Sequence, residues 1–278
     1  MKNMRLKYWF SFLILGSVLV FACKKDKSNQ SNKYISKIYK NGLLEYEFLY
    51  DSKRRPFRRN SFAVGFGQSK FASYRIYQYN SDGNLVEVDY FDKGNEIQQI
   101  FTLNYGVNGE LTRANQANEN GVVNTYFTYQ YNQDGTIASI LRKSANNNQT
   151  NGQNFFFYNN DRLLVKWLRT NLIGNNFVPV DSTNYKLVAR YPVHWNYFEM
   201  NFAISAFPNS DAQLLEMYAD TSMNYRYDAP PQITTRTYSN RVGGTSFPTS
   251  VSQALKIDNG GVITNSIIQY SYEYIDLD

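Results

Sequence analysis

Cysteine and histidine are almost absent from this chain, which has one of each in 278 residues, Cys23 and His194. A single cysteine excludes an intrachain disulfide, and one histidine beside it excludes a Cys/His zinc site. His194 lies among aromatic residues, where a packed or sheet-edge histidine is more usual than a member of a Ser-His-Asp triad. We therefore expect no enzyme activity, no catalytic residue, no cofactor and no metal.

Acidic residues are absent from the first 22 positions, which carry Lys2, Arg5 and Lys7. An apolar stretch, Tyr8–Ala22, follows and is 15 residues long. Such a stretch is short for a membrane-spanning helix and typical of the apolar region of a signal peptide. The sequence therefore predicts that residues 1–22 are a signal peptide.

The apolar stretch ends in Leu19-Val20-Phe21-Ala22-Cys23, an aliphatic residue and a small residue before cysteine. This resembles the lipobox of bacterial lipoproteins, and the resemblance implies that Cys23 becomes the lipidated first residue of the mature protein. Two or three acyl chains would make the membrane a stable partner. Residues 23–33 are polar and charged, and they predict a disordered tether. Lys24 does not resemble the aspartate of inner-membrane retention, so the outer membrane is expected, with its periplasmic or surface face left open.

Strong charge of one sign is also lacking. The net charge of +6 includes the three basic residues of the signal peptide, so the mature chain carries only +3. A mild excess of this kind is typical of a mixed, solvated surface. We expect no nucleic-acid partner and a monomeric protein.

A recurring phrase, Tyr-Asn-x-Asp-Gly-x-Leu or a variant of it, organises the body of the chain. Its copies begin at Tyr50, Tyr79, Tyr105, Tyr131 and Tyr158, which are 29, 26, 26 and 27 residues apart. A near-constant period indicates a repeated supersecondary unit. Asp-Gly and Asn-Gly favour the positive φ of tight hairpin turns, so each copy predicts a strand that ends at the tyrosine and then a turn.

A second turn falls about half a period later, at Asn41-Gly42, Lys93-Gly94-Asn95 and Asn120-Gly121. Between turns, apolar and polar residues alternate as in half-buried strands. The predicted fold is all-β: one antiparallel meander over residues 34–278 that forms a curved sheet or an open or closed barrel. The repeats are regular over 34–168 and irregular over 169–278. Residues 146–152 predict a polar loop, and Ser210 with Gln213 predicts a capping box and a short helix near 211–219.

The phrase resembles the tyrosine-aspartate (YD) repeats of bacterial cell-surface and toxin-shell proteins. The whole layout is more similar to a family of diderm lipoproteins of unknown function with a porin-like fold, whose last strand reads Tyr-x-Tyr-x-Tyr, here Tyr270, Tyr272 and Tyr274. The resemblance covers roughly residues 33–168 and the last strand. It implies a curved antiparallel sheet or barrel and no reaction. This chain departs from the pattern at Arg54 and Arg162, which stand where glycine is expected.

The candidate ligand surface is an aromatic cluster around His194, made of Tyr191, Trp195, Tyr197 and Phe198. Such a cluster can be a stacking platform for a sugar or peptide, or part of the core. A second candidate is a basic patch beside Phe57, made of Arg54, Arg55, Arg58 and Arg59. The patch can meet an anionic surface polymer, or it can protect an edge strand by its charge.

Carboxylates offer two further alternatives. Paired acids two residues apart, Glu45 with Glu47 and Glu87 with Asp89, suit glycoside hydrolysis or a solvated strand face. Aspartates recur at turn positions, where they fit calcium binding or the ordinary hydrogen bonds of Asx-turns: Asp51, Asp82, Asp134 and Asp161.

The sequence thus favours a lipid-anchored envelope protein with a non-enzymatic binding or structural role. Its ligand would be a glycan, a peptide or another envelope protein, and a glycan-acting hydrolase that uses surface carboxylates is the alternative. Charges within the strands, at Arg75, Glu87 and Asp89, predict a wall that does not span the membrane.

Overall fold

The described part of the computed structural model comprises residues 33–160, 164–187, 219–226, 232–241, 248–259 and 262–276. These residues belong to one compact unit, Lys33–Asp278, and form sixteen strands. The first eight are β1 (Lys33–Lys40), β2 (Leu43–Tyr50), β3 (Pro56–Gly65), β4 (Gln68–Tyr79), β5 (Leu85–Asp92), β6 (Ile97–Tyr105), β7 (Leu111–Asn118) and β8 (Val123–Tyr131). The others are β9 (Ile137–Ser144), β10 (Thr150–Tyr158), β11 (Leu164–Ile173), β12 (Asn176–Leu187), β13 (Ala219–Arg226), β14 (Gln232–Arg241), β15 (Pro248–Asn259) and β16 (Val262–Asp276).

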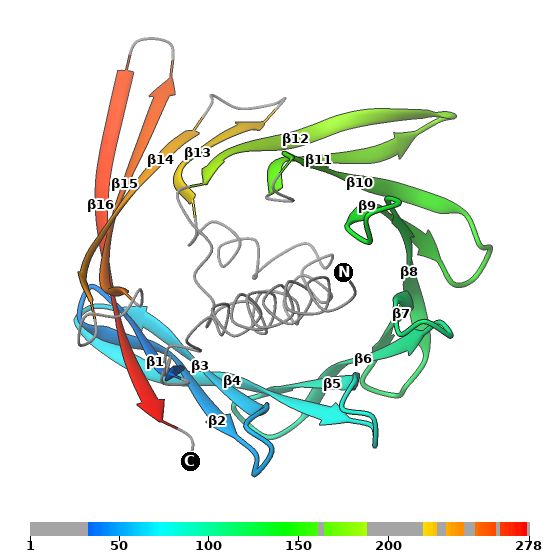
Figure 1. Ribbon diagram of the computed structural model, residues 1–278, viewed down its shortest axis with the longest axis horizontal. Coiled ribbons are helices and arrows are strands. Elements are labelled where there is room, and N and C mark those ends of the chain that lie inside the picture. The colour runs from blue at the N-terminus through cyan, green and yellow to red at the C-terminus, as the bar shows by residue number, and fades with distance from the viewer. Residues whose placement is uncertain are drawn as a thin grey trace, which may run out of the picture. The chain divides into compact units, whose positions relative to one another are not determined.

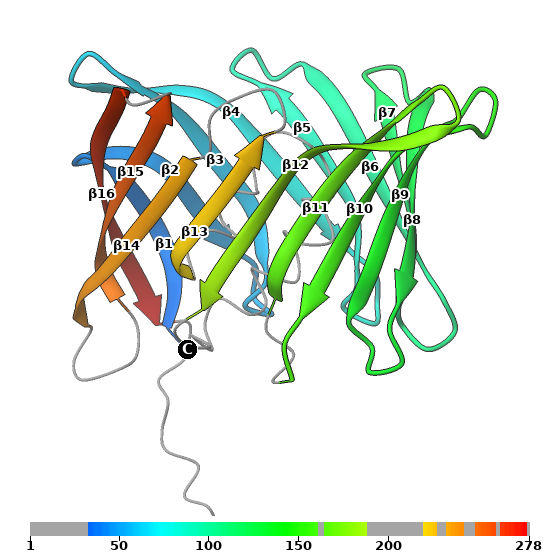
Figure 2. The same ribbon diagram turned by 90° about the horizontal axis from the view of Figure 1, so that it is seen from above.

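The strands follow one another around a single antiparallel sheet, which confirms the predicted all-β meander (Figure 1). β1 pairs with β16 as well as with β2, so the order of strands closes on itself. The side view shows the strands inclined in the wall and the hairpin turns gathered at its two edges (Figure 2).

Two predictions on secondary structure need correction or remain open. The polar loop predicted over 146–152 is shorter, because β10 already begins at Thr150 and includes Gly152. Strands also continue through the half of the sequence where the repeat phrase is lost.

Of the helix predicted near 211–219, only Ala219 is described, and it begins β13. No helix among the described residues is long and apolar enough to cross a membrane.

The turn after β4 shows why the repeat phrase makes a hairpin. The N–H of Asn80 donates to the carbonyl of Asn84 (2.9 Å), and the N–H of Gly83 donates back to the carbonyl of Asn80 (3.1 Å). This three-residue loop requires a positive φ at its last position, and Gly83 has φ 88°. The pairing register shifts beside it, between Gln78 and Tyr79, as expected for a bulge at the base of such a loop. The turns over 106–110 and 132–136 repeat this geometry.

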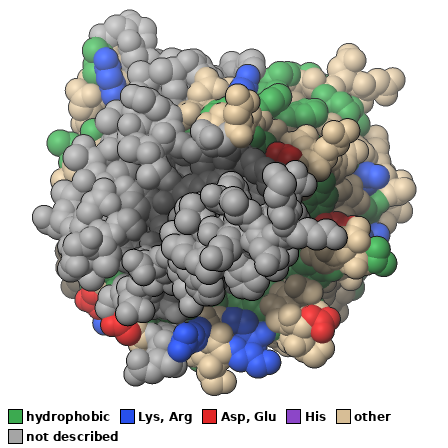
Figure 3. All heavy atoms as spheres, in the orientation of Figure 1, with side chains coloured by type: hydrophobic (Ala, Val, Ile, Leu, Met, Phe, Trp, Pro, Cys, Tyr) green, Lys and Arg blue, Asp and Glu red, His purple; other side chains and the backbone are tan. Residues whose placement is uncertain are grey.

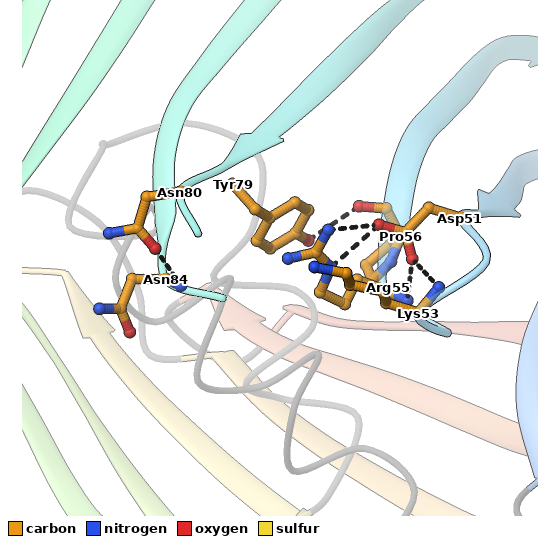
Figure 4. A network of polar contacts seen from close by, with 7 residues as sticks. All are labelled: Asp51, Lys53, Arg55, Pro56, Tyr79, Asn80 and Asn84. Carbon is orange, nitrogen blue, oxygen red and sulfur yellow. Dashed lines mark hydrogen bonds and ion pairs between the residues drawn. The ribbon is translucent and has the colours of Figure 1, made fainter. Parts of the chain in front are cut away.

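Four of the five phrase tyrosines also bond to the backbone of the strand before their own. The hydroxyl of Tyr105 donates to the carbonyl of Leu85 (2.7 Å), and that of Tyr131 donates to the carbonyl of Leu111 (2.8 Å). Leu85 and Leu111 are the first residues of β5 and β7, the second strands of the two preceding hairpins. Further copies of this bond run from Tyr50 to Ile35 and from Tyr79 to Pro56. We call these four bonds the tyrosine ladder; Figure 4 shows the Tyr79 bond, with the Arg55 guanidinium 4.2 Å from the ring centre.

The buried side chains identify the inner face of the sheet. The strand registers place the largest fully buried side chains on one face: Ile38, Arg59, Val88, Phe127, Ile140, Thr183 and Val251. A sheet whose strand order closes has one face inside and one outside, and the inside is the better covered. We therefore assign this face to the inside, and the alternate positions face out.

The turn geometry yields a test of stability. Gly83→Val should lower the free energy of unfolding by about 1–3 kcal/mol, because valine is strained at positive φ. Arg54 occupies the equivalent turn position with φ 64°. Arg54→Gly should therefore raise the free energy of unfolding by about 1 kcal/mol. Gly65→Val is the control, because Gly65 is not among the positive-φ glycines and nothing lies within 4 Å of an added Cβ. Urea midpoints that are equal for wild type and Gly83→Val would show that the turn tolerates a side chain.

The tyrosine ladder predicts a loss of stability at alkaline pH. Burial raises the pKa of Tyr105 and Tyr131 to about 12, above the ordinary value of about 10. Between these values the folded protein keeps protons that the unfolded chain releases, so the free energy of unfolding falls as pH rises from about 10 to 12. The double variant Tyr105→Phe, Tyr131→Phe should be less stable at pH 8, by about 1 kcal/mol per lost bond, and show a weaker fall. Urea midpoints measured at pH 8 and pH 11.5 test this, and identical slopes would contradict it.

Candidate functional site

Several residues that the sequence singled out cannot be placed by the structure. Those outside the described residues include Cys23, Asp161, Arg162, Tyr191, His194, Trp195, Tyr197, Phe198, Ser210 and Gln213. The lipid attachment and the aromatic ligand surface therefore stay predictions. The candidate sites that follow come from the strands and turns.

The predicted basic patch is not one surface. Arg55 forms an ion pair with Asp51 (2.7 Å) beside the turn, whereas Arg58 and Arg59 are neighbours in β3 and lie on opposite faces. Arg58 faces out with its guanidinium 4.0 Å from the ring centre of Tyr74. Arg59 faces in and is only 2% exposed. The two-residue alternation of a strand separates them, and that signal was present in the sequence.

Two of the four predicted turn aspartates, Asp51 and Asp134, accept hydrogen bonds from the backbone. Asp51 accepts the N–H groups of Lys53 and Arg55, each at 2.9 Å, and Asp134 accepts that of Thr136 at 3.0 Å. In the β4–β5 turn the same role belongs to Asn80, whose side-chain oxygen accepts the N–H of Asn84. The Asx-turn explanation is thus confirmed for Asp51 and Asp134. No group of three metal-ligating side chains was found among the described residues.

One of the two predicted acid pairs forms a unit. Glu87 and Asp89 lie on the outer face of β5, and the Gln78 amide nitrogen donates to both, at 2.6 and 2.9 Å. Burial raises the pKa of both carboxyls, and the Asp89 charge raises that of Glu87 further. The pair therefore offers two adjacent acids with a raised proton affinity on an outward surface.

The other predicted acid pair is divided. Glu45 is the extra residue where the β1–β2 register shifts, and it meets Lys40 at 3.7 Å. Burial raises the pKa of the Glu45 carboxyl. Glu47 instead accepts the side-chain N–H of Asn60 on β3 at 2.8 Å. The two carboxylates thus have different partners and do not act as one site.

An aromatic stack that the sequence did not single out lies on the outer face of β3, β4 and β5. The rings of Tyr74 and Phe91 are parallel within 4°, with centres 4.6 Å apart, and Arg58 covers the other side of Tyr74. Phe71 and Phe62 continue the contact toward the β3–β4 turn. Each ring is held by its neighbours, so we interpret the stack as cross-strand packing.

A second feature that the sequence did not reveal is a set of arginines on the inner face. Arg59 and Arg75 are paired in the β3–β4 ladder, and Arg142 and Arg169 lie on β9 and β11. The Arg169 guanidinium bonds to Asp181, and Arg142 donates to the Asn171 side chain at 3.2 Å. Their grouping depends on strand register, to which the local sequence gives little clue. The one signal was Gly152, an isolated glycine that the structure places within a strand.

Comparison with known proteins supports the fold and no more. No family model and no curated protein matches this chain. A porin-like protein from Bacteroides uniformis aligns with 12% identity and a TM-score of 0.53, over 83% of this chain and 89% of that one. One from Bacteroides vulgatus aligns with 10% identity and a TM-score of 0.37, over 86% and 98% of the two chains. A TcdB2-TccC3-Cdc42 structure aligns with 9% identity and a TM-score of 0.24, over 81% of this chain and 13% of that one. The first of these likenesses shows that the chain has a porin-like β fold.

The acid pair on β5 predicts a pH-dependent variant. Since the pKa of Glu87 is raised in the folded state, the folded protein binds its proton more tightly, and stability falls as pH rises above the ordinary glutamate range. Glu87→Gln should therefore melt at a higher temperature than wild type at pH 7, and the gain should shrink at pH 4. Glu119→Gln, in the β7–β8 turn, controls for the loss of one acidic charge. A lower melting temperature for Glu87→Gln at pH 7 would contradict the assignment.

Proposed function

We propose that this chain is a lipid-anchored protein of the bacterial envelope with a non-enzymatic binding or structural role, and that its strands stand in water. The observation that carries the proposal is the polarity of the two faces. The inner face holds most of the buried apolar side chains. On β1 to β5 the outer face carries charged or amide side chains: Lys37, Glu47, Arg58, Asn60, Gln78, Glu87 and Asp89. A membrane-spanning barrel has the reverse arrangement, with an apolar band facing lipid and a polar interior.

One outer row illustrates this polarity. The registers of β16, β1, β2 and β3 align Glu273, Lys37, Glu47 and Asn60 across the sheet. Lys37 and Glu273 form an ion pair at 3.3 Å, and Asn60 donates to Glu47. Along the lower edge of the space-filling view, basic and acidic side chains stand side by side (Figure 3). Charges at such positions would be costly in hydrocarbon, so the row supports a wall that faces water.

The anchor and the location rest on the amino terminus. Its signal peptide and Cys23 motif support attachment to the outer membrane by lipid, with residues 23–33 as the tether. The porin-like fold shared with a protein from Bacteroides fits an envelope protein. A monomeric barrel held outside the bilayer presents its faces and turns to a glycan, a peptide or another envelope protein.

The alternative function, a glycan-acting hydrolase, is favoured by one observation, the outer pair Glu87 and Asp89 with raised pKa values. Both carboxylates accept a hydrogen bond from the same Gln78 amide. Their hydrogen bonds therefore do not distinguish a general acid from a general base. Turnover of a glycan that is abolished by Glu87→Gln or Asp89→Asn would replace the proposal of a non-enzymatic role.

Cleavage of the tether tests the proposed topology. A protease site placed within residues 26–32 of the full chain should, when cut on isolated membranes, release the strand-bearing unit into a detergent-free supernatant. Uncut protein should stay with the membranes because of its lipid. Cys23→Ser is the control for lipidation and should not incorporate radiolabelled palmitate. If the cut protein leaves the membrane only in detergent, the wall spans the bilayer and the proposal is wrong.

A further inference from the structure

Two inner-face arginines are brought together by the registers of β9 to β12. Arg142, Gly152 and Asn171 are directly opposite one another on β9, β10 and β11. One row further along the strands, Asn154, Arg169 and Asp181 are opposite one another on β10, β11 and β12. Directly opposed residues of antiparallel strands point to the same face. The two rows therefore form one polar area, which we call the Arg142–Arg169 patch.

Gly152 makes the reach of Arg142 possible. It lies between Arg142 and Asn171, and an added Cβ would lie 2.6 Å from the carbonyl oxygen of Thr170 and 3.4 Å from Nη2 of Arg142. Because no side chain occupies this position, the Arg142 guanidinium crosses β10 and donates to Oδ1 of Asn171 at 3.2 Å. That bond is to a neutral amide, and no carboxylate of the described residues forms an ion pair with Arg142.

The charges of the patch do not balance. Arg169 is paired with Asp181, whereas Arg142 has no ion pair with a carboxylate among the described side chains. Burial lowers the pKa of Arg142, and the nearby positive charge of Arg169 lowers it further. The patch thus holds an excess of positive charge where solvation is reduced.

Donors without acceptors lie in the same area. Nε of Arg169 is buried and has no hydrogen-bond acceptor among the described residues. The same holds for Nε1 of Trp167, two residues away on the same face of β11. Buried donors without acceptors are uncommon in folded proteins and call for an unseen partner, such as water or an ion. Both groups, like the guanidinium of Arg142, can only donate, so a partner for them must supply acceptors.

The geometry points to an oxyanion-binding site at the Arg142–Arg169 patch, which takes a carboxylate or phosphate group of a ligand. A guanidinium without a carboxylate partner matches the paired oxygens of either group, and Asn171 holds it in place. This inference deepens the proposed binding role, on which it rests, by naming the chemical class of the ligand. The neutral aromatic stack on the outer face of β3, β4 and β5 takes no part in this site.

Titration calorimetry of the full-length lipidated chain in mild detergent tests the site. The probes are glucuronate, inorganic phosphate and glucose, at constant ionic strength. One or both of the anions should bind and glucose should not, because it lacks the anionic group. Binding of glucuronate alone identifies a carboxylate site, and binding of phosphate alone identifies a phosphate site. If neither anion binds, or if glucose binds as well as glucuronate, the inference is wrong.

Variants separate the site from general charge effects. Arg142→Gln should weaken anion binding at least tenfold. Arg113→Gln removes an outer-face arginine that is stacked on Tyr126, and it should leave binding unchanged. If Arg142→Gln does not fold, Asn171→Asp replaces it, because this isosteric change neutralises Arg142 and should also abolish binding. Equal affinity in wild type and the folded patch variants would overturn the site. If tether cleavage releases the protein but no anion binds to it, the oxyanion site is wrong and the proposed function still stands.

Discussion

The bond from a tyrosine hydroxyl to the backbone of the preceding hairpin is the interaction on which the regular half of the sheet depends. A hairpin formed by local turn chemistry is only marginally stable alone, and it needs a neighbour to fix its position. Tyr105 and Tyr131 provide that link at the edge of the wall, each by a bond to the first residue of the second strand of the hairpin before it. The phrase tyrosine therefore does two things at once, since it ends a strand and sets the alignment of two successive hairpins.

That alignment determines which side chains meet on each face. Once the registers are fixed, strand alternation sends Val88, Phe101 and Phe127 inward and Glu87 and Asp89 outward. Burial of the apolar inner face stabilises the wall, and under the proposed function the polar outer face stays in water. A porin-like arrangement of strands is thus compatible with either a wet or a lipid-facing wall, and the side chains on the outer face distinguish the two.

The sequence could predict those parts of the structure that have local causes. Gly83 and its counterparts mark turns because a positive φ excludes most residues, and the tyrosines mark strand ends because the turns follow them directly. Two errors had identifiable signals, since alternation separates Arg58 from Arg59 and the isolated Gly152 marks a crossing point in β10. The acceptor of each tyrosine hydroxyl had no such signal. It lies about one hairpin back along the chain, and its identity depends on the register between strands.

Register also determines which polar side chains meet in the Arg142–Arg169 patch on the inner face. Buried guanidinium groups are stable in a sheet only when rings, amides or carboxylates surround them. Arg59 and Arg75 lie near the rings of Tyr46 and Tyr90, and Arg169 has Asp181. Among the described residues Arg142 has only an amide as its partner, held at a gap that one glycine creates. Of these four inner-face arginines it is the one to which the described residues supply neither a ring nor a carboxylate, and a role in ligand binding is best sought at this patch.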